Sequence, residues 1–80
     1  MNMRAKFELQ NVTQIAEDAE ELRFVAVTEK PFDEEGNSED NSFSRWTPTG
    51  ELTMTITNPN LIGTMEPGEK YYLDFTKTEN

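Results

Sequence analysis

The chain has 80 residues, of which 34% are hydrophobic, and carries a formal net charge of −9 at pH 7. A chain of this length forms one domain at most. It contains no cysteine and no histidine, which excludes disulfides and thiolate metal sites and removes the usual general base. With seven basic residues against sixteen acidic ones, direct nucleic-acid binding is disfavoured and basic protein surfaces are the natural partners.

The first third of the chain predicts two antiparallel strands. Apolar and polar residues alternate with period two between Ala5 and Ile15, and Val12 breaks this alternation as a nearby β-bulge would. The acidic stretch 17–21 predicts a turn. Residues 22–29 predict a second strand with apolar side chains on both faces, which is typical of a central strand, and Pro31 would end it.

The segment 32–42 is rich in acidic and small polar residues and has no bulky apolar residue after Phe32. Such a composition buries too little surface to offset the entropy lost on ordering. The sequence therefore predicts a mobile acidic loop inside a single β-domain that spans residues 1–80.

The rest of the chain predicts three further strands and one short helix. Residues 43–47 predict a short strand that forms a hairpin with the strictly alternating stretch 51–57. An Asn-Pro pair then starts a short helix over 60–65, and residues 70–76 alternate again as a last strand. The predicted fold is all-β with one short helix: a small five-stranded barrel or rolled antiparallel sheet of the OB or SH3 type.

Four motifs occur together: RAKF at 4–7, TPTGEL at 47–52, NP at 58–59 and PGEKYYLDFT at 67–76. In this combination the chain resembles small uncharacterised proteins of tailed bacteriophages of similar length. The resemblance implies a phage product that acts in the cytoplasm of a host bacterium, and it implies no particular activity.

Ten of the sixteen carboxylates lie between Glu17 and Asp40. Such an acidic belt could bind a basic protein surface, and carboxylates spaced like phosphates could mimic a nucleic-acid backbone and inhibit a host defence or DNA-handling enzyme. The alternative is that the belt only keeps the domain soluble. The residues expected to contact a protein partner are five loop carboxylates and two partly exposed aromatic side chains: Asp33, Glu34, Glu35, Glu39, Asp40, Trp46 and Tyr72.

Neither a metal site nor a catalytic site is expected. Oxygen-bearing residues alternate from Asp33 to Glu39 as in a calcium loop, but the glycine of such a loop is misplaced and its final glutamate is missing, and the flanking segments predict strands rather than helices. Without histidine or a glycine-rich phosphate loop, we expect no cofactor and no enzymatic activity.

Two other functions stay open. Exposed strand edges could pair between copies of the chain, as in a virion or assembly component. The aromatic side chains could instead stack on single-stranded nucleic acid, as in OB-type domains. No stretch is long and apolar enough to span a membrane, so we expect a cytoplasmic protein. The resemblance to phage proteins implies that its partner is a host or phage protein. The sequence sets no oligomeric state.

Overall fold

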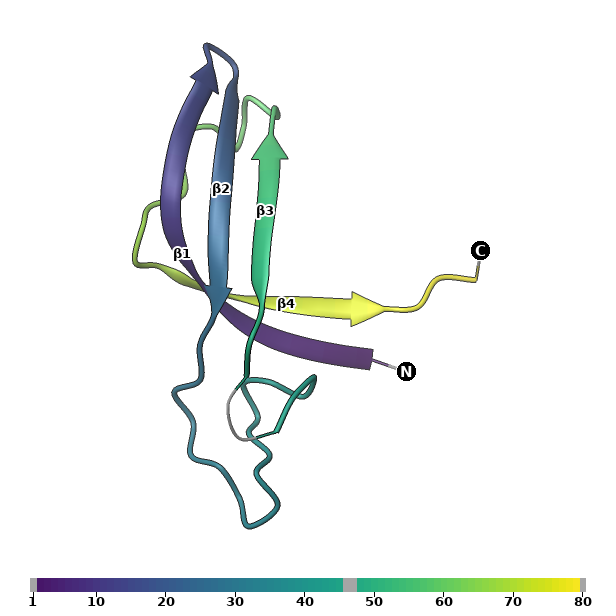
Figure 1. Cartoon of the computed structure of the whole chain (residues 1–80). Coiled ribbons are helices and arrows are strands. Elements are labelled where there is room, and N and C mark those ends of the chain that lie inside the picture. Colours follow the sequence, from purple (N-terminus) through teal and green to yellow (C-terminus); the bar gives the residue numbers. More distant parts are fainter. Residues whose placement is uncertain (1, 46–47, 80) are drawn as a thin grey trace.

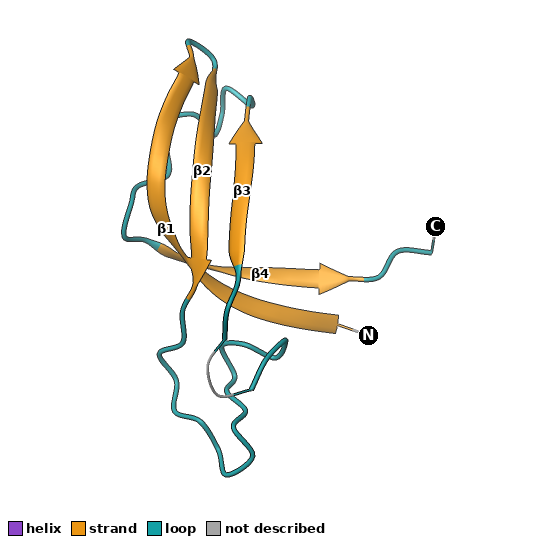
Figure 2. Cartoon of the chain, in the orientation of Figure 1, coloured by secondary structure: helices purple, strands orange, loops and turns teal. Residues whose placement is uncertain are grey.

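The computed structural model describes residues 2–45 and 48–79, which form one antiparallel sheet of four strands (Figure 1). The order across the sheet is β3-β2-β1-β4, so β1 and β2 are central. No helix occurs in the described residues, and all regular structure in Figure 2 is strand. The bounds are β1 Asn2–Ala16, β2 Ala19–Ala26, β3 Glu51–Ile56 and β4 Lys70–Thr76.

The long strand β1 organises the sheet because it pairs with two strands in succession. Its residues 2–8 pair with β4, and its residues 7–16 pair with β2. The register with β2 shifts between Leu9 and Asn11, which places a β-bulge at the point where the pairing passes from one partner to the other. Bulges bend a strand and increase its twist, and Figure 1 shows β1 strongly curved. The predicted bulge is confirmed.

The sheet curls into half a barrel and does not close. Its Cα radius of gyration is 14.5 Å, whereas a compact domain of this length would have about 12 Å. The first residues of β1 and the whole of β4 form an arm that runs across the direction of β2 and β3 (Figure 1). Within the described residues, β3 and β4 are therefore the two edges of an open sheet.

The core lies on one face of this sheet. Every second residue at the start of β1 and in β2 is buried, as the predicted alternation requires, and Phe24 meets the ring of Tyr71 edge to face at 6.0 Å between centroids. Gly50 lies against the same core, because a Cβ there would stand 3.2 Å from Cζ of Phe7. The buried cluster consists of Ala5, Phe7, Leu9, Leu22, Phe24 and Ile56.

The predicted hairpin and the fifth strand are wrong. Residues 43–45 lie in turns and bends, and the remainder of the predicted strand 43–47 lies outside the described residues. β3 pairs instead with β2, with Leu22 opposite Met54 and Phe24 opposite Leu52. This pairing brings Leu52 and Ile56 of β3 onto the core, and Phe43 packs against the same core from the loop without forming a strand.

The predicted helix is also wrong. Residues 58–64 form consecutive turns closed by the bonds from Leu61 N to Asn58 O, at 2.9 Å, and from Thr64 N to Leu61 O, at 3.1 Å. Gly63 has a φ of +80°, which interrupts any helical repeat. Ile62 in these turns packs against the core. No helix in the described residues has the length and apolar character needed to cross a membrane.

Candidate functional site

The acidic belt of the sequence is divided in two by the fold. Glu17, Asp18 and Glu21 lie at the tight turn that joins β1 to β2, and we call them the turn pole. A second group of acidic residues lies in the loop that follows the opposite end of β2 (Figure 1). The eight residues of β2 separate the two groups by roughly 25 Å. The second group, the loop pole, is Asp33, Glu34, Glu35 and Glu39.

Asp33 shapes the loop pole from within. Its Oδ1 accepts hydrogen bonds from the backbone N–H of Glu35 and of Asn37, both at 2.9 Å, and its own N–H donates to Asn37 O at 2.9 Å. These contacts make a compact Asx-type turn in which Gly36 takes a φ of +87°. Hydrogen bonds from Asn37 and Glu35 lower the pKa of Asp33. The alternation that resembles a calcium loop thus serves a turn, with the first carboxylate bound to backbone amides.

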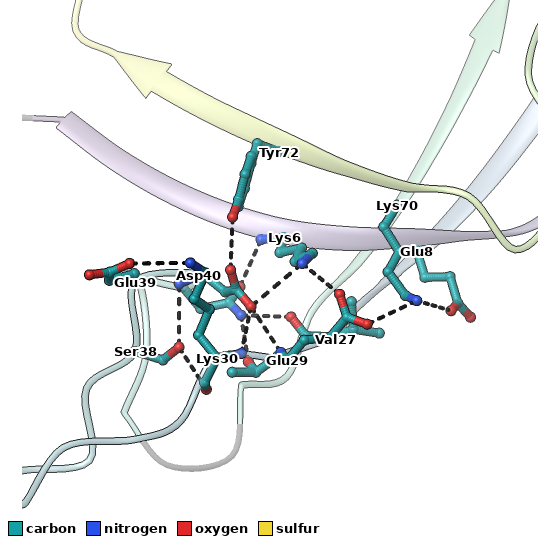
Figure 3. A network of polar contacts seen from close by, with 12 residues as sticks. Lys6, Glu8, Val27, Glu29, Lys30, Ser38, Glu39, Asp40, Lys70 and Tyr72 are labelled. Carbon is teal, nitrogen blue, oxygen red and sulfur yellow. Dashed lines mark hydrogen bonds and ion pairs between the residues drawn. The ribbon is translucent and has the colours of Figure 1, made fainter.

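Asp40 ties the loop to the sheet. Its side chain is fully buried, and its Oδ2 accepts the backbone N–H of Glu29 and of Lys30, each at 2.9 Å. Its Oδ1 accepts the hydroxyl of Tyr72 on β4 at 2.8 Å, and Lys6 Nζ on β1 lies 3.6 Å from Oδ2 (Figure 3). One carboxylate therefore joins the loop, β1 and β4.

The charged form of Asp40 is strongly favoured despite its burial. Burial alone would raise the pKa of this carboxyl. The hydrogen bonds from Glu29 N and Lys30 N outweigh that effect, and Tyr72 and the charge of Lys6 add to them, so that the pKa falls from 3.8 to about 2. At neutral pH the loop is thus held by an ionised, hydrogen-bonded carboxylate.

Ion pairs extend this network along the outer face of the arm. Lys6 Nζ lies 2.6 Å from Glu29 Oε1, and the other oxygen of Glu29 lies 3.0 Å from Lys70 Nζ, which in turn lies 3.9 Å from Glu8 (Figure 3). Hydrogen bonds from Lys6 and Lys70 lower the pKa of Glu29, and the bond with Glu29 raises the pKa of Lys6. Two lysines therefore offset most of the negative charge of three carboxylates, Glu8, Glu29 and Asp40, where the loop crosses the outer face.

Tyr72 is surrounded by cations on the same face. The guanidinium of Arg4 lies 4.4 Å from the ring centroid, and Lys6 Nζ lies 5.6 Å from it, both within cation–π range. Arg4 also donates to both oxygens of Asp74, at 2.7 and 3.3 Å, which raises the pKa of Arg4 and lowers that of Asp74. Tyr72 keeps 45% of its surface exposed, but its hydroxyl and its ring already have partners.

Asn41 and Ser42 complete the attachment by replacing a strand beside β1. The side-chain oxygen of Asn41 accepts the N–H of Lys6 at 2.9 Å, while its Nδ2 donates to Val27 O at 2.7 Å. Ser42 pairs with Arg4 in both directions, through Ser42 N to Arg4 O at 2.9 Å and Arg4 N to Ser42 Oγ at 2.7 Å. Asn41 is 1% exposed, so its own hydrogen bonds are shielded from water, whereas Ser42 and its bonds with Arg4 lie at the surface.

The predicted contact residues are therefore placed in different environments. Glu34, Glu35 and Glu39 are exposed, whereas Asp33 directs its carboxylate to the loop backbone. Asp40 has no exposed surface and cannot touch a partner in this structure, because it forms the attachment of the loop. Tyr72 is partly exposed as expected, and Trp46 lies outside the described residues.

Sequence reasoning missed the basic residues that surround this site. Three of the seven, which looked scattered along the chain, converge on the outer face of the arm: Arg4, Lys6 and Lys70. The charges of β1 and β4 could have indicated this pairing, because they are complementary in the register that forms: Arg4 lies opposite Asp74 and Glu8 opposite Lys70. Opposite charges facing each other across neighbouring strands favour such a pairing.

A shallow depression of about 540 Å³ adjoins the loop pole and is lined by Lys30, Pro31, Asp33, Asn37, Ser38 and Glu39. Within the described ranges, no group of three or more potential ligand residues could hold a metal ion. The chemistry that the site offers is thus charge and hydrogen bonding at a surface. Comparison of the chain with family models, with curated proteins and with solved structures finds no match.

Proposed function

We propose that this chain is a non-enzymatic binding protein that engages a basic protein surface through the loop pole. The observation that supports this most is that Glu34, Glu35 and Glu39 are exposed on a loop whose backbone is tied down by Asp33 and Asp40. A loop that is already ordered loses little conformational entropy on binding, so its charges are presented at low cost.

The charge of the loop pole is only partly balanced. Lys30 Nζ lies 3.6 Å from Glu39, and Arg45 donates to the backbone carbonyl of Glu35 at 2.6 Å, whereas Glu34 and Glu35 form no ion pair within the described residues. With a net charge of −9, the chain repels anionic partners and attracts cationic ones over a Debye length of about 10 Å at 0.1 M salt. A basic protein surface fits this charge.

The resemblance to phage proteins suggests the setting in which such a surface would act. In that setting the chain is an accessory protein in the host cytoplasm, and its partner is a host or phage protein. A basic cleft that normally receives nucleic acid, as in a host defence or DNA-handling enzyme, is one surface that clustered carboxylates would occupy as a mimic.

Two matched triple variants test the proposal. The loop variant carries Glu34→Gln, Glu35→Gln and Glu39→Gln, and the turn variant carries Glu17→Gln, Asp18→Asn and Glu21→Gln, so both remove three negative charges. Each immobilised protein is used to capture proteins from a bacterial lysate at several salt concentrations. A captured protein that is retained by the natural chain and the turn variant, lost with the loop variant and released by salt supports the proposal. Equal capture by the two variants contradicts it.

A second candidate function is that of an assembly component, which the open edges of β3 and β4 favour. The third candidate, a stacking platform for single-stranded nucleic acid, gains no support from Tyr72, since cations cover its ring and Asp40 holds its hydroxyl. An electrophoretic shift of a labelled oligonucleotide at low salt would revive that candidate.

A further inference from the structure

The free edge of β4 can accept another strand. In the described part of the chain β4 has β1 on one side and no strand on the other, and its pairing with β1 runs over seven residues without a register shift. β4 contains no proline, and it has no bulge that would twist its edge away. Edges of this kind pair readily with a strand from another molecule.

The backbone groups that face this edge follow from the contacts of β1. The N–H and C=O of Arg4 pair with Ser42, and the C=O of Lys6 accepts the N–H of Val27, so the even-numbered residues of the arm point away from β4. Along an antiparallel strand these directions alternate. The odd-numbered residues of β1 must therefore bond to the odd-numbered residues of β4. The residues of β4 that direct N–H and C=O outward are Lys70, Tyr72, Asp74 and Thr76.

We propose that β4 pairs antiparallel with β4 of a second copy of this chain, about a two-fold axis at Leu73. This register overlaps Lys70–Thr76 with itself over its full length. The backbone N–H and C=O of Tyr72 then pair with those of Asp74 in the second copy, and the backbone N–H and C=O of Lys70 pair with those of Thr76. An interface about a two-fold axis is closed, so it yields a dimer rather than a fibre.

The side chains of β4 are complementary to themselves in this register. On the apolar face Leu73 meets Leu73, and Phe75, which is 51% exposed in the single chain, lies opposite Tyr71 of the second copy. Aromatic pairs directly opposite each other stabilise neighbouring strands. Immediately outside the strand, Glu69 of each copy lies opposite Lys77 of the other, which places opposite charges together twice.

Other registers and the other edge fit less well. An axis at Asp74 sets two like charges opposite each other, and an axis at Tyr72 places Phe75 opposite Glu69. β3, the second free edge in the described chain, carries the single charged residue Glu51 and so offers no opposite charge to a copy of itself. The charge pattern therefore selects β4 and the axis at Leu73.

A charge swap tests this interface by sedimentation over a range of protein concentrations. We expect the natural chain to dimerise, and Lys77→Glu to weaken the dimer on the order of tenfold because two attractive pairs become repulsive. The double variant Glu69→Lys, Lys77→Glu should restore dimerisation. Lys30→Glu, which makes the same charge change in the loop, should weaken it much less than Lys77→Glu.

Residue-resolved amide hydrogen exchange of the natural chain gives a second readout that mutations cannot confound. The amides of Lys70, Tyr72, Asp74 and Thr76 should gain protection as the protein concentration rises, while the odd-numbered amides between them are protected throughout. Three outcomes would each overturn the proposal. The natural chain could stay monomeric up to millimolar concentration, the gain in protection could fall in β3 instead of β4, or the double variant could fail to restore dimerisation. The proposal does not depend on the acidic loop, so its failure would leave the proposed function untouched.

Discussion

At the scale of single residues, the attachment of the acidic loop depends on the carboxylate of Asp40. It satisfies two backbone amides, the hydroxyl of Tyr72 and part of the charge of Lys6, all in a position shielded from water. Removing a buried charged partner leaves these groups without compensation, which is among the more damaging changes in a folded protein.

We expect Asp40→Ala to lower the free energy of unfolding by about 3 kcal/mol, because the two amides and the hydroxyl lose their acceptor and Lys6 loses an ion-pair partner. Urea unfolding measures this. The neighbouring Glu39→Ala is the control and should change stability by less than about 0.5 kcal/mol, since its side chain is 84% exposed. Equal effects of the two substitutions would show that Asp40 does not anchor the loop.

The same carboxylate makes stability depend on acid pH. Its pKa of about 2 in the folded chain lies below the value of 3.8 that it has when unperturbed, so the unfolded chain takes up the proton first as pH falls. Its contribution of about 2 kcal/mol is therefore complete above about pH 4 and largely lost at pH 2. The difference in unfolding free energy between the natural chain and Asp40→Asn should shrink over this interval, and a difference that is constant from pH 6 to pH 2 would contradict the assignment.

The role of Asp40 could not be predicted from the sequence. Among nine other carboxylates in the same stretch it has no distinguishing neighbour, and its burial is produced by Lys6 and Tyr72, which are more than 30 residues away in the chain. Glu34, Glu35 and Glu39 were predictable as exposed, because exposure of a charged side chain in a polar loop is the default.

At the scale of elements, alternation predicted the four strands that form, because a period of two depends only on neighbouring residues. Pairing is a property of segments far apart. The rule that successive strands pair holds for β3, which joins β2 across a loop of 24 residues between Ala26 and Glu51, but it fails for β4, which pairs with β1. The loop in turn takes the place of a missing strand beside β1, through Asn41 and Ser42. When the side chains of Asn41 and Ser42 form the hydrogen bonds that a strand backbone would form, the sequence shows no alternation from which the pairing could be predicted.

The substitute strand leads to a prediction for Asn41. Its amide bridges the N–H of Lys6 and the C=O of Val27 while almost fully buried, so Asn41→Ala should lower the free energy of unfolding by about 2 kcal/mol. Asn60→Ala, at an exposed position in the turns before β4, is the matched control and should be nearly neutral. Thermal or urea unfolding compares the two, and a neutral Asn41→Ala would mean that the loop does not support β1.

At the scale of the whole molecule, the chain is an open sheet that measures 48 × 33 × 16 Å, with acidic groups at both ends of β2 and a network of ion pairs on the arm. The predicted all-β class and the rolled antiparallel sheet are confirmed, whereas the predicted fifth strand and short helix are wrong: four strands form a half-barrel with two unpaired edges in the described residues. The mobility of the loop stays a prediction, made from a composition that reports only how much apolar surface the segment can bury. The polar contacts of Asp33, Asp40 and Asn41 hold the loop by a different means.

Whether loop and sheet form one body is best tested by amide hydrogen exchange in the natural chain at neutral pH. The amides of Glu29 and Lys30, which donate to Asp40, and those of Glu35 and Asn37, which donate to Asp33, should exchange clearly more slowly than the amides of Glu34 and Glu39 in the same loop. Rapid exchange at the unprotected rate for all six amides would contradict an ordered loop, and with it the fixed acidic surface on which the proposed function depends.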